Sequence, residues 1–191
     1  MNGIHTRQAI VIIGRKDSIY ATLRLYQRSE GTEWRFIDEM PAVLGRNGLT
    51  DDKREGDGKT PIGCFQIGTA FGTDPSLQIV WPYRLAGPCD YWVDDPDSPD
   101  YNRWVEYSGD PNERWKSYER LAIPLYEHAL VIRYNEDPVI PGKGSAIFFH
   151  RWSDPDIPSA GCITASEENT TRVLRWFQPK MNPVFVIKEG S

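Results

Sequence analysis

The chain has 191 residues and a formal net charge of −5, with 39% hydrophobic and 26% charged residues. This length and composition are ordinary for one globular domain with a sizeable core, so we expect a single domain over residues 1–191. The acidic balance and the lack of a basic stripe argue against nucleic-acid binding. No stretch approaches the roughly 20 apolar residues that a membrane span needs. The N-terminus also lacks the charged and apolar regions of a signal peptide.

The first half of the chain is predicted to consist of short strands separated by turns. Strands are predicted over residues 9–13, 19–26, 34–37, 64–68 and 91–94. Residues 19–26 alternate between apolar and polar side chains, which is typical of a half-buried strand. The polar and glycine-rich segment 45–63 is predicted to be a loop.

The second half begins with an excursion over residues 94–115 that is rich in Pro, Asp, Asn and Tyr. Loops of this length are usually functional, so we predict a long inserted loop that covers the cleft and selects the substrate. The later predicted elements are a short helix at 117–121, strands at 129–134, 146–150 and 184–187, and a helix at 166–177. Thr164 with Glu167, or Ser166 alone, is predicted to cap that last helix. Together, these predicted elements indicate a mainly β fold with few helices.

A cysteine and a histidine twelve residues apart carry the most chemical information. Cys162 follows Ser159, Ala160 and Gly161, and His150 ends an apolar run. A thiol becomes an enzyme's nucleophile when a nearby base takes its proton. Small residues before it let backbone N–H groups point at a developing oxyanion. The pattern indicates a cysteine acyltransferase, with a buried structural cysteine as the alternative.

Several motifs, taken in order, resemble the YkuD-type L,D-transpeptidases, which cross-link peptidoglycan. That family's signature has a histidine, a variable loop, then Ser or Thr, a residue that is often histidine, Gly and Cys, and His150 and residues 159–162 resemble it. The other matching positions are Gly45-Arg46-Asn47-Gly48, Gly56-Asp57-Gly58-Lys59-Thr60-Pro61-Ile62-Gly63, Phe65, Ile67, Tyr91-Trp92-Val93-Asp94-Asp95-Pro96, Tyr101-Asn102 and Trp104-Val105. The last three of these resemble a branch with a shorter active-site loop. The resemblance is strongest over residues 43–183 and implies a YkuD-like β-sandwich or barrel.

The resemblance also implies a mechanism. Cys162 would attack a tetrapeptide stem of peptidoglycan to form a thioester, and a diamino acid of a second stem would resolve it into a link between diamino acids. His150 would take the thiol proton, and we expect ion pairing with His150 to lower the pKa of Cys162. The backbone N–H groups of Gly161 and Cys162, with Ala160, would form the oxyanion hole. No metal or organic cofactor is implied, and we expect a monomer whose partners are stem peptides.

Three residues near the histidine are candidates for substrate binding: Arg151, Trp152 and Ser159. Arg151 is the nearest partner for a substrate carboxylate, and the alternative is local packing with a solvated charge. Two positions depart from the family pattern. Ala160 stands where many members have a second histidine, and Thr164 stands where many have Arg or Asn. These departures leave open how substrate carboxylates are held and whether the product is a cross-link.

Two other functions use the same residues differently. A cysteine amidase or L,D-carboxypeptidase would pass the acyl group to water. A non-catalytic cell-wall binding module would use only the aromatic cleft. Because the family works outside the cytoplasmic membrane, we expect a location in the cell envelope, in the periplasm or on the cell-wall side. Any export signal would then have been removed, or export would follow another route.

The remaining cysteines and histidines give weaker signals. Cys64 and Cys89 would form a disulfide in an oxidising compartment, and two reduced buried cysteines are the alternative. His5 and His128 are not spaced with the cysteines as zinc ligands are, so no metal site is predicted.

Overall fold

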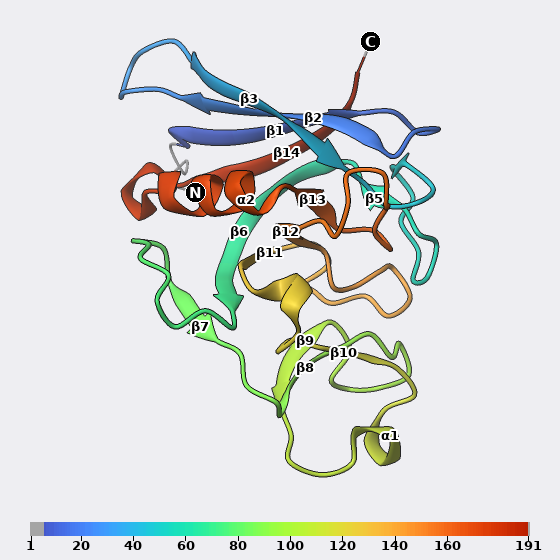
Figure 1. The fold of residues 1–191 in the computed structure, drawn as a ribbon. Coiled ribbons are helices and arrows are strands. Elements are labelled where there is room, and N and C mark those ends of the chain that lie inside the picture. The colour runs from blue at the N-terminus through green and yellow to red at the C-terminus, as the bar shows by residue number, and fades with distance from the viewer. Residues whose placement is uncertain (1–5, 191) are drawn as a thin grey trace.

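Most of the chain forms strands, as the alternating and apolar segments predict. The computed structural model describes residues 6–190 and is drawn in Figure 1. The strands of the large sheet are β1 (Gln8–Gly14), β2 (Tyr20–Gln27), β3 (Arg35–Val43), β6 (Gly63–Gly72), β7 (Tyr83–Leu85), β11 (Ala129–Ile132), β12 (Phe148–Arg151), β13 (Ile163–Ala165) and β14 (Val184–Glu189). Their order is β11-β12-β13-β3-β2-β1-β14-β6-β7, and β6 also pairs with β11. All of these strands except β7 therefore close into a mixed barrel, which confirms the predicted fold class.

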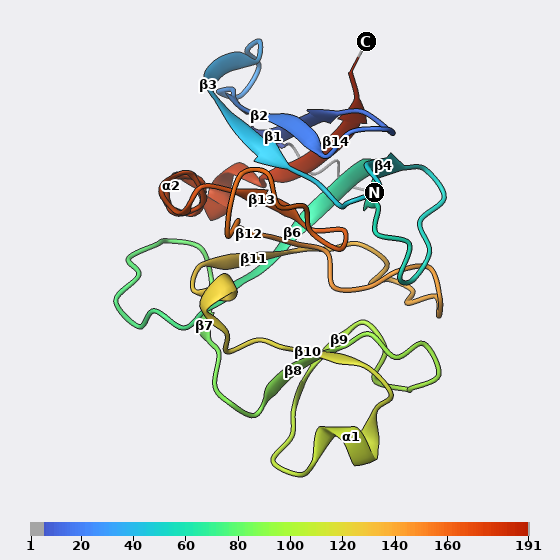
Figure 2. The ribbon, with the colours of Figure 1, turned by 45° about the vertical axis from the view of Figure 1, so that its right-hand side comes forward.

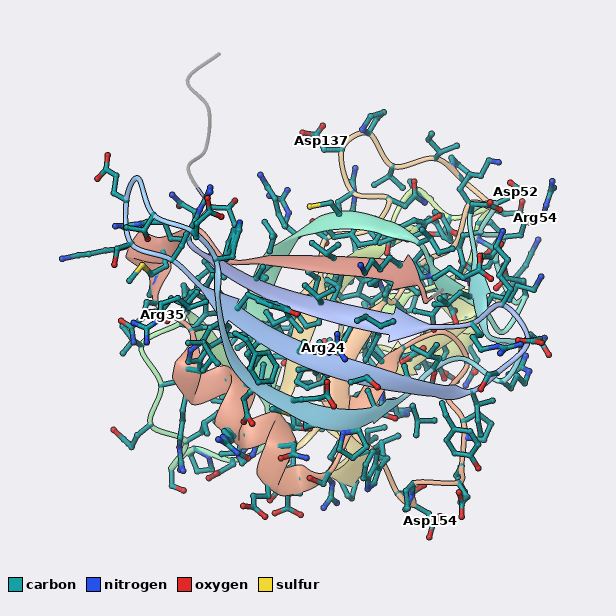
Figure 3. All side chains as sticks on the ribbon, turned by 90° about the horizontal axis from the view of Figure 1, so that it is seen from above. Arg24, Arg35, Asp52, Arg54, Asp137 and Asp154 are labelled. Carbon is teal, nitrogen blue, oxygen red and sulfur yellow. The ribbon has the colours of Figure 1, made fainter. Side chains whose placement is uncertain are left out.

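Alternation of side chains decides which face of each strand enters the barrel. On the antiparallel pair β1 and β2, Ile10 lies opposite Leu25 and Ile12 opposite Leu23, and all four side chains are buried. Each such side chain stabilises the fold by about 1.5–3 kcal/mol relative to its exposed state. Figure 3 shows the opposite, outer face of these strands, where Arg24 pairs with Glu39 of β3 at 2.6 Å.

The helix near the C-terminus covers the barrel beside β12 and β13. This helix, α2 (Glu167–Trp176), buries Thr170, Val173 and Leu174. The Ser166 hydroxyl accepts a hydrogen bond from the Asn169 amide at 3.1 Å, so Ser166 is the N-cap. Thr164 lies on β13 instead, and of the two caps that the sequence predicts, Ser166 is the one observed.

A second part of the molecule, residues 90–120, lies on one side of the barrel, and we call it the cap. Figures 1 and 2 both show it below the barrel, away from β1, β2 and β3. Its elements are β8 (Asp90–Val93), β9 (Arg103–Glu106), α1 (Pro111–Arg114) and β10 (Tyr118–Arg120), and the strands form a sheet in the order β10-β8-β9. Buried Tyr91, Val93 and Trp115 form a cluster inside it.

The cap corrects two expectations. Residues 94–115 were expected as a long inserted loop, but they contain β9 and α1 and fold back onto β8. Residues 117–121 were expected as a short helix, but they contain strand β10, which pairs antiparallel with β8. The pairing explains the error, because partner strands far away in sequence override the weak local helical pattern.

The remaining elements are small. They are β4 (Leu49–Thr50), β5 (Thr60–Pro61), and the 3-10 helices η1 (Pro124–Tyr126) and η2 (Pro179–Met181). β4 pairs with β5 inside the glycine-rich loop 45–63, so the loop prediction holds apart from this short ladder. Cys64 and Cys89 are both free thiols. His5 lies outside the described residues. Within 6–190, no helix is long and apolar enough to cross a membrane.

Candidate active site

Cys162 and His150 lie on the outer face of the barrel wall, under the cap. β12 and β13 run parallel, with Phe149 opposite Ile163, and both of these side chains are fully buried in the barrel interior. Because successive side chains of a strand point to opposite faces, the neighbouring Phe148 and His150 point outward. Cys162 precedes β13 and packs with Phe148 in the cluster between barrel and cap. Two adjacent strands thus bring the two residues together from twelve positions apart.

The Cys162 thiol is buried and held by the barrel backbone. Its Sγ donates to the Ala146 carbonyl oxygen at 3.3 Å and accepts from the Phe148 amide at 3.4 Å. Burial, with the charge of Glu119, raises the pKa of the Cys162 thiol well above its usual range. Among the described residues no hydrogen bond joins it to His150. The resting cysteine is therefore a neutral thiol.

The His150 imidazole is buried and oriented by the main chain. Its Nδ1 lies 2.7 Å from the Arg151 carbonyl oxygen, which favours the tautomer with the proton on Nδ1 and an unprotonated Nε2, and the Leu125 backbone also lies near the ring. Burial lowers the pKa of His150 to about 4, against smaller opposing effects of backbone hydrogen bonds. Both groups are neutral at rest, so the expected ion pair with Cys162 is not present. A neutral imidazole with an unprotonated Nε2 is the form that accepts a proton.

The turn before Cys162 needs a glycine and an anchor. Gly161 has φ +152°, a backbone conformation that other residues rarely adopt, and a Cβ there would lie 2.9 Å from the Lys59 carbonyl oxygen. The Thr60 hydroxyl donates to the Gly161 carbonyl oxygen at 2.9 Å and accepts from the Gly45 amide at 2.9 Å. The upstream glycine-rich loop therefore fixes the turn that carries the nucleophile.

The serine of the motif also shapes this turn. The Ser159 hydroxyl donates to the Cys162 carbonyl oxygen at 2.6 Å and accepts from the Gly161 amide at 3.0 Å. The Gly161 N–H is therefore already used inside the turn. The other two amides predicted for the oxyanion hole, those of Ala160 and Cys162, do not take part in this hydrogen bond with Ser159.

A cavity of about 280 Å³ opens beside the two residues. Its lining is mostly apolar, and it includes Cys162, His150, Trp152, Ser159, Ala160 and Thr164, together with Glu119, Leu125 and Tyr126. Trp152 and Ser159 thus lie where the sequence predicts substrate contacts. Arg151 is not among the lining residues, because its guanidinium pairs with Glu167 at 2.9 Å and donates to the Pro124 carbonyl at 3.0 Å. The geometry gives no support to Arg151 as the carboxylate partner.

Among the residues of this cavity that sequence reasoning missed, Glu119 and Tyr126 matter most for the chemistry. Glu119 lies on β10 of the cap, and Tyr126 ends η1. The Tyr126 hydroxyl donates to Glu119 Oε2, and the Tyr126 ring meets the His150 ring edge-on at 4.9 Å. No local signal marks either residue, because Glu119 reaches the site only through the pairing of β10 with β8.

The described residues, 6–190, contain no group of three or more His, Cys, Asp or Glu side chains arranged to hold a metal ion. A comparison with curated proteins finds no match. The model of the YkuD L,D-transpeptidase catalytic domain matches residues 8–186, nearly the whole chain, which includes the barrel, the cap and the turn that carries Cys162. By this match the chain belongs to the YkuD family of L,D-transpeptidase catalytic domains, whose members act on peptidoglycan outside the cytoplasm.

Proposed function

We propose that this protein is a cysteine acyltransferase of the cell envelope that acts on peptidoglycan tetrapeptide stems and links diamino acids through a Cys162 thioester. The observation that carries the proposal is the shared cavity of Cys162 and His150, with the His150 ring oriented by the hydrogen bond of its Nδ1 to the Arg151 carbonyl. The family match supports the substrate class.

In the first half-reaction, Cys162 Sγ attacks the carbonyl carbon of the diamino acid that precedes the terminal D-alanine. The thiol proton passes to His150 Nε2 as the S–C bond forms, so no stable thiolate is required. The C–N bond then breaks, and His150 returns the proton to the departing amine of D-alanine. This route fits a thiol and an imidazole that are both neutral at rest.

The oxyanion of the tetrahedral intermediate needs N–H donors in fixed positions. The amides of Cys162 and Ala160 are the better candidates, because the Gly161 amide donates to Ser159 Oγ. A role for Gly161 would require that hydrogen bond to open. Removing one such donor in other enzymes lowers kcat by about 10²–10³.

The test is the mass of the intact protein after incubation with a tetrapeptide stem. An increase equal to the stem minus D-alanine, captured by rapid acid quenching before the thioester is resolved, is expected for the wild type and is lost in Cys162→Ala. Cys64→Ala and Cys89→Ala are matched controls, because both thiols are free, and both variants should keep the adduct. An adduct that persists in Cys162→Ala would overturn the assignment.

Product analysis separates the alternative functions. Dimers linked between two diamino acids support the acyltransferase, and trimmed monomers alone would identify an amidase or L,D-carboxypeptidase. Binding to cell walls with no adduct would identify a non-catalytic module.

A further inference from the structure

The cavity beside Cys162 contains one carboxylate that the first half-reaction does not use. Among the residues that line it, Glu119 is the only acidic one. Its side chain comes from β10 of the cap, whereas Cys162 and His150 come from the barrel. Among residues 6–190, Glu119 makes no ion pair with a Lys, Arg or His side chain. The Tyr126 hydroxyl donates a hydrogen bond to one of the two Glu119 oxygens. The carboxyl group is thus held by a hydrogen bond and has no basic partner among these residues.

This carboxylate opposes the formation of a thiolate. Its charge contributes to the raised pKa of Cys162, second only to burial. A negative group at this place therefore works against the nucleophile in the first half-reaction. After acylation the sulfur carries no charge, and the repulsion disappears. The placement makes physical sense if Glu119 acts in the second half-reaction, when a positively charged amine must enter the same cavity.

We propose that Glu119 binds the ammonium group of the second stem and accepts its proton, so that the free amine attacks the Cys162 thioester. The inference rests on the proposed acyltransferase function. The N–H proton of the ammonium moves to a Glu119 oxygen, the amine nitrogen bonds to the thioester carbon, and the C–S bond breaks. The second proton of the nitrogen passes through His150 to the departing thiolate. The proton on Glu119 is then released to solvent.

The surroundings of Glu119 suit this task. Burial raises the pKa of Glu119 to about 7, the Tyr126 hydrogen bond opposes the rise, and the charges of Asp94 and Glu55 add to it. A proton acceptor works best when its pKa is near the working pH. Glu119 is half-buried, so a ligand in the cavity can reach it. The mostly apolar walls strengthen the attraction between a carboxylate and an ammonium.

Glu119→Gln tests the proposal, because it keeps the shape of the side chain and an oxygen for Tyr126. The two half-reactions are measured separately: release of D-alanine from a tetrapeptide stem, and then decay of the acyl-enzyme with diaminopimelic acid as the amine or with water alone. We expect acylation to stay the same or to rise, because the opposing charge is removed, and aminolysis to fall by about 10²–10³. Hydrolysis should stay within about threefold, so the ratio of linked to hydrolysed product should fall with aminolysis.

Two controls sharpen the result. Glu113→Gln removes an exposed carboxylate of the cap and should leave both half-reactions unchanged. Hydroxylamine, which is largely unprotonated at neutral pH, should resolve the acyl-enzyme nearly as fast in Glu119→Gln as in the wild type. For the wild type, aminolysis by diaminopimelic acid should show an inflection near pH 7 that the Gln variant lacks.

Three outcomes would overturn the inference. One is an unchanged ratio of linked to hydrolysed product in Glu119→Gln. Another is a loss confined to acylation, which would place Glu119 against the donor stem. The third is a wild type that forms no acyl-enzyme, which would overturn the proposed function itself and is visible before any amine is added.

Discussion

The barrel and the cap both supply side chains to the cavity around Cys162, but different forces hold them. The barrel interior is a large cluster of aliphatic and aromatic side chains. The cap has only a small cluster, in which Tyr91 packs against Trp115 at 5.5 Å and Tyr118 at 5.2 Å. Its loops are held by individual carboxylates: Asp95 accepts from the Lys116 amide at 2.9 Å, and Asp100 accepts from the Trp115 indole at 2.9 Å.

This difference indicates in which part of the molecule a single substitution will lower the stability most. Burial energy is spread over many side chains, so the barrel loses little when one surface contact is removed. A hydrogen-bonded structure with a small core depends on each polar contact, because an unpaired buried group costs about 1–3 kcal/mol. The nucleophile thus stands on the part held by burial, and Glu119 stands on the part held by specific polar contacts.

The largest effect is expected at a buried residue of the cap that bonds to the rest of the molecule. Asn102 is buried, and its Oδ1 accepts from the Trp92 indole of the cap at 3.0 Å and from the Ala146 amide of the barrel at 3.2 Å. Its Nδ2 donates to the carbonyl oxygens of Tyr134 and Asn135 at 3.0 and 2.7 Å. Asn102→Ala leaves these four groups unpaired, so we expect the free energy of unfolding to fall by about 3–5 kcal/mol. Urea unfolding measures this.

Asn102 also has a positive φ of 56°, which asparagine tolerates better than alanine. Asn102→Gly relieves that strain but restores no hydrogen bond, so it should remain destabilised by most of the same amount. Glu113→Gln, at an exposed position of α1, should change stability by less than about 1 kcal/mol. Cys162 should also become easier to alkylate in Asn102→Ala, with exposed Cys64 as the internal reference. An unchanged Cys162 rate would mean that the cap does not depend on this residue.

A second prediction uses one titrating group from each part. The folded pKa of His150, about 4, lies below its ordinary value of 6.5. At a pH between these two pKa values the unfolded chain binds a proton that the folded protein does not, so stability falls as the pH drops. The folded pKa of Glu119, about 7, lies above its ordinary 4.5, so the folded state holds the extra proton and stability rises as the pH drops. Between pH 7 and pH 5 each effect amounts to about 2 kcal/mol, and the two oppose each other.

Variants should separate these opposing effects. Relative to the wild type, His150→Gln should gain about 2 kcal/mol of stability on going from pH 7 to pH 5, and Glu119→Gln should lose about 2 kcal/mol. Urea unfolding at both pH values gives each difference, and the change common to all proteins cancels. Parallel curves for all three proteins would show that neither group has a shifted pKa.

The same division decides how much the sequence could predict. Period-two alternation marks β2, and apolar runs mark β1 and β12, because burial inside the barrel dictates those residues. The face that carries Cys162 and His150 follows from the strand period once the two strands are known to be neighbours. β10 has no such pattern, because the positions of Tyr118, Glu119 and Arg120 are set by pairing with β8.

The ionisation state of the pair could not be predicted for a related reason. Spacing places a histidine near a cysteine, but the burial of both groups in the folded protein sets their pKa values. Likewise, the position of Arg151 after His150 indicates a substrate contact, whereas Glu167 on α2 binds it from across the fold. The sequence shows which residues are neighbours along a strand. It does not show which side chains from other elements, such as Glu167, will pair with them.

The smallest effect is expected from a change confined to the barrel side. Ser166→Ala removes the N-cap of α2, whose hydroxyl accepts from the Asn169 amide, and we expect a loss of about 1 kcal/mol in the free energy of unfolding. Ser166→Asp keeps an acceptor and should be nearly neutral, and Ser108→Ala, exposed in the cap, should also have little effect. Because α2 packs on β12 and β13 and lies away from the cap in Figures 1 and 2, alkylation of Cys162 should keep its wild-type rate in Ser166→Ala. If that rate rises as far as in Asn102→Ala, the nucleophile is protected by the stability of the whole fold, and the division between barrel and cap should be abandoned.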